Sequence, residues 1–392
     1  MAPATPRELF DLWAEIQPRG LPRPALVRHV HVAPWLQRLR DTSPGLFQVE
    51  EVGHSVEGRS LQVVRVGSGP LRVLLWSQMH GNEPTATTAL LGLLEYVRHH
   101  REHPRVARML SALTLDALPL LNPDGAERFQ RRNAQGLDIN RDALALQTPE
   151  GRALKALRDR IEPALGFNLH NQNWRTAVSG TGQPASISLL APPFNAERHD
   201  NPGRLFAKRV CAVIRDALEP LAPGRIGRYD DSFEVRAFGD NLTRWGTPTV
   251  LIETGPWPSS DPDEPLLRLN FVALVSALEA LASGTVEQAD LGHYEAIPLN
   301  RDEGWMHLLL RGVRVFGEAG EAFVADVGVA AAQAVRMREG EPCVVLTGTI
   351  QELGDLRVLG AVETVDGAGL LVLPLPAEGA TEGDTQIGRA HV

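Results

Sequence analysis

The sequence predicts an α/β protein with three layers, in which a mostly parallel, twisted sheet carries helices on both faces. Short apolar runs typical of buried strands alternate with segments of helical periodicity over most of the chain. The 392 residues, 43% hydrophobic and 22% charged, are enough to bury a full core. At roughly 100–200 residues per domain, this length indicates about two domains.

The individual elements follow from local patterns. LRVLLW at 71–76, apolar except for Arg72, has the pattern of a buried strand. Pro84 suits the first position of a helix, where its missing N–H costs nothing. The predicted strands cover 71–76, 113–121, 166–170, 186–191 and 249–253. The predicted helices cover 84–100, 150–165, 203–219 and 263–283.

The composition changes near residues 282–287. Beyond this point the chain consists of short Val-, Leu- and Gly-rich segments without a long helical period. We therefore predict a helical lead-in at 1–49, a main α/β unit at 50–285 and a small β-rich C-terminal domain at 288–392.

Charge and composition exclude several classes of protein. The chain has 39 Lys and Arg against 48 Asp and Glu, a net charge of −9, so no basic field favours nucleic acid. Neither a signal-like apolar segment nor a run of roughly 18 apolar residues is evident, which predicts no membrane partner and a cytoplasmic location. Cys211 and Cys343 have no metal or redox spacing. The oligomeric state is not predicted.

A candidate metal site begins at His80-Gly81-Asn82-Glu83, between a predicted strand and a predicted helix. Imidazole nitrogen and carboxylate oxygen are ligands of catalytic zinc, which takes three protein ligands and keeps one open position. His170, which ends the strand GFNLH, is the best third ligand. The alternatives are a solvated loop for the pair and a satisfied core histidine for His170.

Two further segments add polar groups near predicted strand ends. Residues 120–142 contain the turn Asn-Pro-Asp-Gly and many charges, and Leu137 and Ile139 alternate there with Asp138 and Asn140. An arginine beside a metal suits the binding of a substrate's terminal carboxylate. The plain alternative is that these charged residues form a solvated loop. Glu253 ends the apolar strand TVLIE, where burial would raise its proton affinity and suit a general base; the alternative is a turn residue.

These motifs together resemble the zinc carboxypeptidases related to carboxypeptidase A. HxxE, NPDG, R-x-N-A-x-G-x-D-x-N-R, a strand-end His and a strand-end Glu occur in that family's order, over about 50–285. The resemblance implies the carboxypeptidase fold and one Zn²⁺ per chain. It assigns His80, Glu83 and His170 as zinc ligands and Glu253 as the general base.

The resemblance also implies how substrate is held. Arg131 matches the arginine that stabilises the oxyanion, with Arg132 as the alternative if the register shifts by one. Asn140 and Arg141 match the pair that binds the substrate's C-terminal carboxylate, Asp138 matches the carboxylate that orients the first zinc histidine, and Tyr229 is the candidate substrate-capping tyrosine. Asp142 departs from the usual Asn and is expected to add negative charge near the carboxylate site.

The implied function is hydrolysis of the C-terminal peptide bond of a peptide with a free C-terminus. One alternative is a deacylase resembling aspartoacylase or succinylglutamate desuccinylase, which shares the HGNE corner and a β-rich C-terminal domain. The NPDG turn and the RxNA segment favour the peptidase. A binding module that keeps the fold without activity is disfavoured, because every required residue type is present in order.

Overall fold

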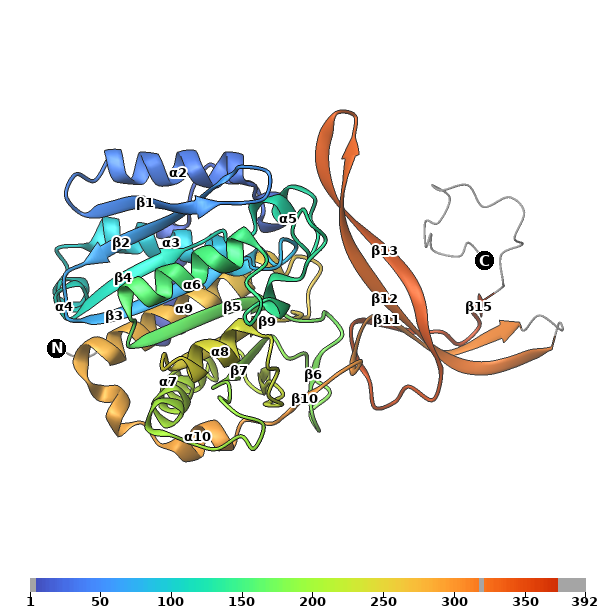
Figure 1. The fold of residues 1–392 in the computed structure, drawn as a ribbon. Helices are drawn as coiled ribbons and strands as arrows, with labels where there is room; N and C mark the ends of the chain where they lie inside the picture. Colours follow the sequence, from blue (N-terminus) through green and yellow to red (C-terminus); the bar gives the residue numbers. More distant parts are fainter. Residues whose placement is uncertain (1–4, 317–320, 373–392) are drawn as a thin grey trace.

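In the computed structural model of this chain, which describes residues 5–316 and 321–372, an eight-stranded mixed sheet forms the centre (Figure 1). Its order is β1-β2-β4-β3-β5-β9-β7-β8. The strands are β1 (Phe47–His54), β2 (Ser60–Gly67), β3 (Leu71–Ser77), β4 (Leu113–Leu118), β5 (Leu165–Asn171), β7 (Ile187–Leu190), β8 (Ile226–Arg228) and β9 (Thr249–Thr254). Its middle, β4-β3-β5-β9, is parallel, whereas the β1–β2, β2–β4 and β7–β9 pairs are antiparallel.

Helices cover both faces of this sheet. The α-helices are α1 (Pro6–Ile16), α2 (His29–Asp41), α3 (Thr85–His100), α4 (Pro104–Ala112), α5 (Pro123–Glu127), α6 (Pro149–Ile161), α7 (Pro202–Leu218), α8 (Phe238–Arg244), α9 (Asp263–Ser283) and α10 (Leu291–Glu295). The 3₁₀ turns are η1 (Pro24–Leu26), η2 (Ile139–Arg141) and η3 (Thr285–Gln288). The three-layer arrangement agrees with the fold class predicted from the sequence.

Burial on both faces accounts for the apolar run Val73–Trp76 in β3. Val73 and Leu75 belong to the core under α1, α3, α7 and α9, while Leu74 and Trp76 belong to a second core under α6 and α8. Successive strand side chains point to opposite faces, so the stretch of β3 that is buried on both faces is apolar at consecutive positions.

Helix α9 shows where composition alone misleads. Among the described residues it is the one helix that is long and apolar enough to cross a membrane, a feature the sequence analysis overlooked. In the structure, 67% of its most apolar window is buried inside the protein. Phe271 packs against Trp13 of α1, with ring centroids 5.7 Å apart, and against Tyr96 of α3. It is a central core helix of the main body.

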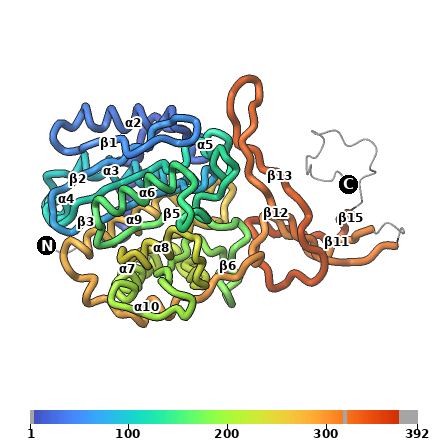
Figure 2. Tube along the Cα trace, in the orientation of Figure 1, coloured from blue at the N-terminus to red at the C-terminus, as the bar shows by residue number. Residues whose placement is uncertain are grey.

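The C-terminal part forms a second sheet, of five strands. These are β11 (Trp305–Phe316), β12 (Ala322–Arg338), β13 (Glu341–Gly354), β14 (Gly360–Asp366) and β15 (Leu371–Val372). The β12–β13 hairpin is long and extends away from the main body, as both the ribbon and the tube show (Figures 1 and 2). A two-stranded sheet of β6 (Ala177–Val178) and β10 (Asn300–Arg301) joins the two parts.

Candidate active site

The carboxyl ends of three neighbouring parallel strands place the candidate residues at one edge of the sheet. His170 on β5 pairs in register with Glu253 on β9, and Ser77 at the end of β3 pairs with Leu169. His80 and Glu83 lie in the short connection between β3 and α3. This edge is where ligands of α/β sheets ordinarily bind.

The connection after β3 is turned sharply at Gln78, whose φ of +51° lies in the left-handed region. That conformation is uncommon for a residue with a side chain and needs support from its surroundings. The Gln78 amide donates to the Gly81 carbonyl at 2.9 Å, and its oxygen accepts the Thr87 hydroxyl at 2.8 Å. The buried glutamine therefore fixes the turn that brings His80 and Glu83 over the strand ends.

Helix α5 supports this turn from behind, which gives the NPDG motif a structural role. Asn122 accepts the N–H of Gly125 at 2.8 Å and donates to the Met79 carbonyl at 3.1 Å. A Cβ on Gly81 would lie 2.0 Å from the carbonyl carbon of Gly125 and 2.3 Å from the nitrogen of Ala126. The two backbones touch, so position 81 accepts glycine alone.

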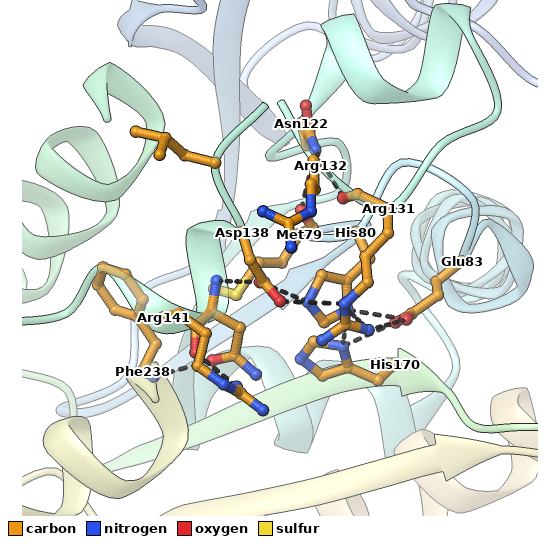
Figure 3. Close-up of polar contacts among 12 residues, drawn as sticks. Met79, His80, Glu83, Asn122, Arg131, Arg132, Asp138, Arg141, His170 and Phe238 are labelled. Atoms are coloured by element: carbon orange, nitrogen blue, oxygen red, sulfur yellow. Dashed lines mark hydrogen bonds and ion pairs between the residues drawn. The ribbon is translucent and has the colours of Figure 1, made fainter. Parts of the chain in front are cut away.

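The three predicted metal ligands converge (Figure 3). One ligand atom each of His80, Glu83 and His170 lies within 4.8 Å of the others, and all three side chains are buried. Glu83 Oε1 is 2.7 Å from His80 Nδ1, Glu83 Oε2 is 2.7 Å from His170 Nδ1, and the two Nδ1 atoms are 3.2 Å apart. Two nitrogens bound tetrahedrally to one zinc at about 2.05 Å would be about 3.3 Å apart. The donor set therefore fits a zinc ion.

Asp138 fixes the orientation of the first histidine. Its Oδ1 lies 3.1 Å from His80 Nε2, which leaves Nδ1 facing Glu83 and His170. Hydrogen bonds from the outer nitrogen of a metal-binding histidine to a carboxylate set the ring orientation in this way. Burial raises the pKa of Asp138, but the hydrogen bond with His80 and the charge of Arg131 outweigh it, so the pKa lies well below its usual range.

Burial and neighbouring charges give the three carboxylates of the site different pKa values. Burial raises the pKa of Glu83, but the neighbouring imidazoles outweigh this and hold the pKa far below its ordinary value. Glu253 has no such partner, and burial together with the charge of Glu83 raises its pKa well above the ordinary value. Its Oε2 is buried without a hydrogen-bond partner. Glu253 is thus the carboxylate of this edge with the highest proton affinity.

Tyr229 follows β8 and faces the same region. The charge of Glu253, followed by burial, raises the pKa of its phenol, with smaller effects of Asp302 and Glu83. The phenol is therefore kept in its neutral, hydrogen-bond-donating form. Asp302, which directly follows β10, contributes to this shift, an effect that the sequence did not indicate.

The two neighbouring arginines point in different directions (Figure 3). Arg131 donates from Nε to Asp138 at 3.0 Å and from Nη1 to Glu83 at 3.3 Å. Arg132 donates instead to the Gly136 carbonyl at 2.8 Å, in its own loop. The structure brings Arg131 to the candidate metal ligands and leaves the alternative, Arg132, outside.

Asn140 and Arg141 lie in η2, beside the ligand cluster. Asn140 Oδ1 accepts the N–H of Phe238 at 2.9 Å, which leaves its amide NH₂ as the group to offer a ligand. The half-exposed Arg141 lies 3.4 Å from a Glu234 carboxylate oxygen. The expectation for Asp142 is wrong: its carboxylate is buried and accepts the Thr148 N–H and hydroxyl, each at 2.7 Å.

Comparison with known proteins agrees with this geometry. Residues 32–176 match the family described as zinc carboxypeptidase. This segment belongs to the zinc carboxypeptidase family. It carries the three candidate ligands, Asp138 and the arginines, but it ends before Tyr229 and Glu253.

Individual relatives cover limited parts of the chain. A probable carboxypeptidase 2 of Arthroderma benhamiae is 35% identical over 159 residues, 38% of this chain and 29% of the relative. The carboxypeptidase N catalytic chain of Homo sapiens is 29% identical over 134 residues, 29% of each protein. The chain therefore spans about three tenths of the length of these curated relatives.

Solved structures of the carboxypeptidase fold match a larger share. A metallo-carboxypeptidase from Burkholderia cenocepacia aligns with a TM-score of 0.53 and 18% identity over 65% of this chain and 69% of its own. Bovine thrombin-activatable fibrinolysis inhibitor, in complex with tick carboxypeptidase inhibitor, aligns with a TM-score of 0.52 and 14% identity over 67% of this chain and 98% of its own. At these identities the likeness shows the fold.

The contact between the zinc-site turn and α5 can be tested with Gly81→Ala. The added methyl meets backbone that cannot give way, so we expect displacement of His80 and Glu83, a lower zinc content, and a loss of stability of about 1–3 kcal/mol. Metal analysis and urea unfolding measure both effects. Asn82→Ala, on the exposed neighbour, is the matched control. Full zinc occupancy in Gly81→Ala would contradict the proposed contact.

A second test concerns the buried Asp240 of α8, which accepts the N–H of Glu234 at 3.1 Å. Burial raises the pKa of Asp240 to about 7. The folded protein therefore keeps this proton up to about pH 7, whereas the unfolded chain loses it near pH 4, so Asp240 destabilises the fold progressively across that range.

We expect Asp240→Asn to gain stability relative to the parent protein as the pH rises from about 5 to about 8. Urea unfolding at several pH values measures the difference. Asp261→Asn, at a largely exposed side chain, should show no such trend. A difference for Asp240→Asn that does not change with pH would show that this carboxyl titrates normally.

Proposed function

We propose that this chain is a zinc-dependent metallocarboxypeptidase that removes the last residue of a peptide with a free C-terminus, using one Zn²⁺ per chain. The observation that carries the proposal is the convergence of His80, Glu83 and His170, with Asp138 behind the first histidine, in a segment of the zinc carboxypeptidase family. The deacylase alternative is not favoured, because that matched segment also contains Arg131 and Arg141.

Glu253 is the proposed general base. When bound, zinc lowers the pKa of water and polarises a carbonyl oxygen. Glu253 then accepts the proton of the attacking water and passes it to the leaving amine. Its burial, unpartnered oxygen and raised pKa support this role, because a useful base holds the proton between the two steps.

Arg131 is the proposed oxyanion donor. Its hydrogen bonds to Asp138 and Glu83 hold the guanidinium at the rim of the ligand cluster. A preorganised cation at this place stabilises negative charge that develops on the scissile carbonyl. Loss of one such donor typically costs about 10²–10³ in rate.

Residues of η2 are proposed to bind the C-terminal carboxylate of the substrate. Arg141 offers a guanidinium, and Asn140 offers an NH₂ group because its oxygen already accepts from Phe238. Both groups donate hydrogen bonds, as a terminal carboxylate requires. Tyr229, held neutral beside Glu253, is the proposed cap over the bound residue. The cytoplasmic location stays a prediction.

Replacing the base tests the mechanism. Glu253→Gln keeps the shape of the side chain but cannot accept a proton, so we expect unchanged zinc content with kcat lowered by about 10²–10⁴. Metal analysis and hydrolysis of a panel of peptides with free C-termini measure the two effects. Glu264→Gln, on an exposed side chain of α9, is the control. Activity like that of the parent protein would remove Glu253 from the role.

Replacing the end-recognition arginine tests the substrate class. Charge-assisted hydrogen bonds contribute about 1.5–3 kcal/mol, so Arg141→Ala should reduce the preference for free over amidated C-termini by about tenfold or more. Paired peptides that differ only in this group measure the ratio of kcat/KM. Arg132→Ala, which removes an arginine bonded within its own loop, should leave the ratio unchanged. An equal loss on both peptides would contradict end recognition.

A further inference from the structure

A cleft of about 270 Å³ lies where the main body meets the C-terminal sheet. Its apolar lining comes from both parts, and none of these residues belongs to the site described above. The lining includes Trp174, Pro256, Trp257, Trp305, Val344 and Leu346. This volume is below the roughly 300–1,000 Å³ of pockets that hold whole small ligands, so the cleft suits a single large side chain.

The cleft is continuous with the candidate active site along the chain. Trp174 lies four residues after His170, and Trp257 lies four residues after Glu253. Those two site residues are register partners on neighbouring parallel strands. Four residues of chain span at most about 14 Å, so the α-carbons of both tryptophans lie within that distance of those of His170 and Glu253, about the length of four extended substrate residues.

The wall supplied by the C-terminal sheet is tied to the loop that carries Trp174. The largely buried guanidinium of Arg175 lies 3.2 Å from a Glu303 oxygen and 3.4 Å from a Glu352 oxygen. The backbone N–H of Trp305 donates to the backbone carbonyl of Arg175 at 2.9 Å. Since Glu303, Trp305 and Glu352 all belong to the C-terminal part, the cleft is formed in advance of any ligand.

The chemistry of the lining selects an uncharged occupant. His307, which also lines the cleft, accepts the Ala331 N–H at Nδ1, and burial lowers the pKa of its imidazole. The histidine is therefore neutral, and Arg23, the charged residue of the lining, is paired with Asp263 at 2.7 Å. The indoles, prolines and aliphatic groups present apolar surface. An aromatic or large aliphatic side chain would gain most from leaving water here.

We propose that this cleft binds an apolar or aromatic side chain of the substrate, about two to four residues before the scissile bond. The C-terminal sheet is then part of the substrate-binding surface, and the preferred substrates are peptides of several residues rather than dipeptides. This inference rests on the proposed carboxypeptidase function and adds to it a substrate class.

The test compares two sets of peptides with the same panel of C-terminal residues. One set consists of N-blocked dipeptides, which are too short to reach the cleft, and the other of hexapeptides with Trp or Ser at each upstream position. In the zinc-loaded protein we expect kcat/KM for the best Trp hexapeptide to exceed that of its Ser counterpart by about 10- to 100-fold.

Two substitutions in the cleft should reduce that ratio to a few-fold while leaving dipeptide hydrolysis unchanged. Trp257→Ala removes one indole, and Leu346→Ser changes a side chain that is 59% exposed and so has little influence on folding. Ile350→Ser is the matched control, because Ile350 lies on the same strand with 55% exposure but does not line the cleft.

The outcomes separate the two proposals. If dipeptides are hydrolysed but Trp and Ser hexapeptides react equally fast, or if Leu346→Ser leaves the ratio intact, the cleft is not a substrate site and the carboxypeptidase function stands. If no peptide of either set is hydrolysed by the zinc-loaded protein, the carboxypeptidase function fails, and the inference about the cleft fails with it.

Discussion

The in-register parallel pairing of β3, β5 and β9 is the constraint on which the site depends. It places His170 beside Glu253 and brings both to the edge where the chain turns from β3 into His80 and Glu83. Strand side chains alternate between faces, so a slip of one residue in β5 would turn His170 away from its partners. The two apolar cores that cover β3 on both faces resist such a slip.

Close backbone contact and local strain position the turn that carries His80 and Glu83. The left-handed Gln78 and the touching backbones of Gly81 and Gly125 hold the turn after β3 against α5. In this arrangement, burial and neighbouring charges give the chemically identical carboxylates of Glu83 and Glu253 different pKa values. The pKa of Glu83 is lowered by two imidazoles, and the pKa of Glu253 is raised by burial and by Glu83. Such divergence is how environment assigns acid and base roles in active sites.

The segment that leads into the C-terminal sheet is bonded to the main body near the candidate site. Asn300 donates to Gln172 at 2.9 Å and accepts the Ser188 hydroxyl at 2.9 Å, behind the ends of β5 and β9. The Tyr294 hydroxyl accepts the N–H of Ala191 inside the main body. Of the residues in these contacts only Gln172 lies within residues 32–176, the segment matched to the family; Ser188, Ala191, Tyr294 and Asn300 lie beyond it.

By itself the sequence determined the fold class and the residue types of the site. The periods of its apolar runs predict the central strands and the covering helices, and the order of HxxE, NPDG, His170 and Glu253 identifies the residues that the structure brings to one edge. The sequence did not predict the β1–β2 hairpin, because the alternation of apolar and polar residues is weak there. It also misplaced Asp142, whose carboxylate turns into its own loop. Only the tertiary structure showed that Arg131, rather than Arg132, lies beside the candidate ligands, and only it assembled the aromatic cleft. Both depend on side-chain direction and on contacts between segments far apart in the chain.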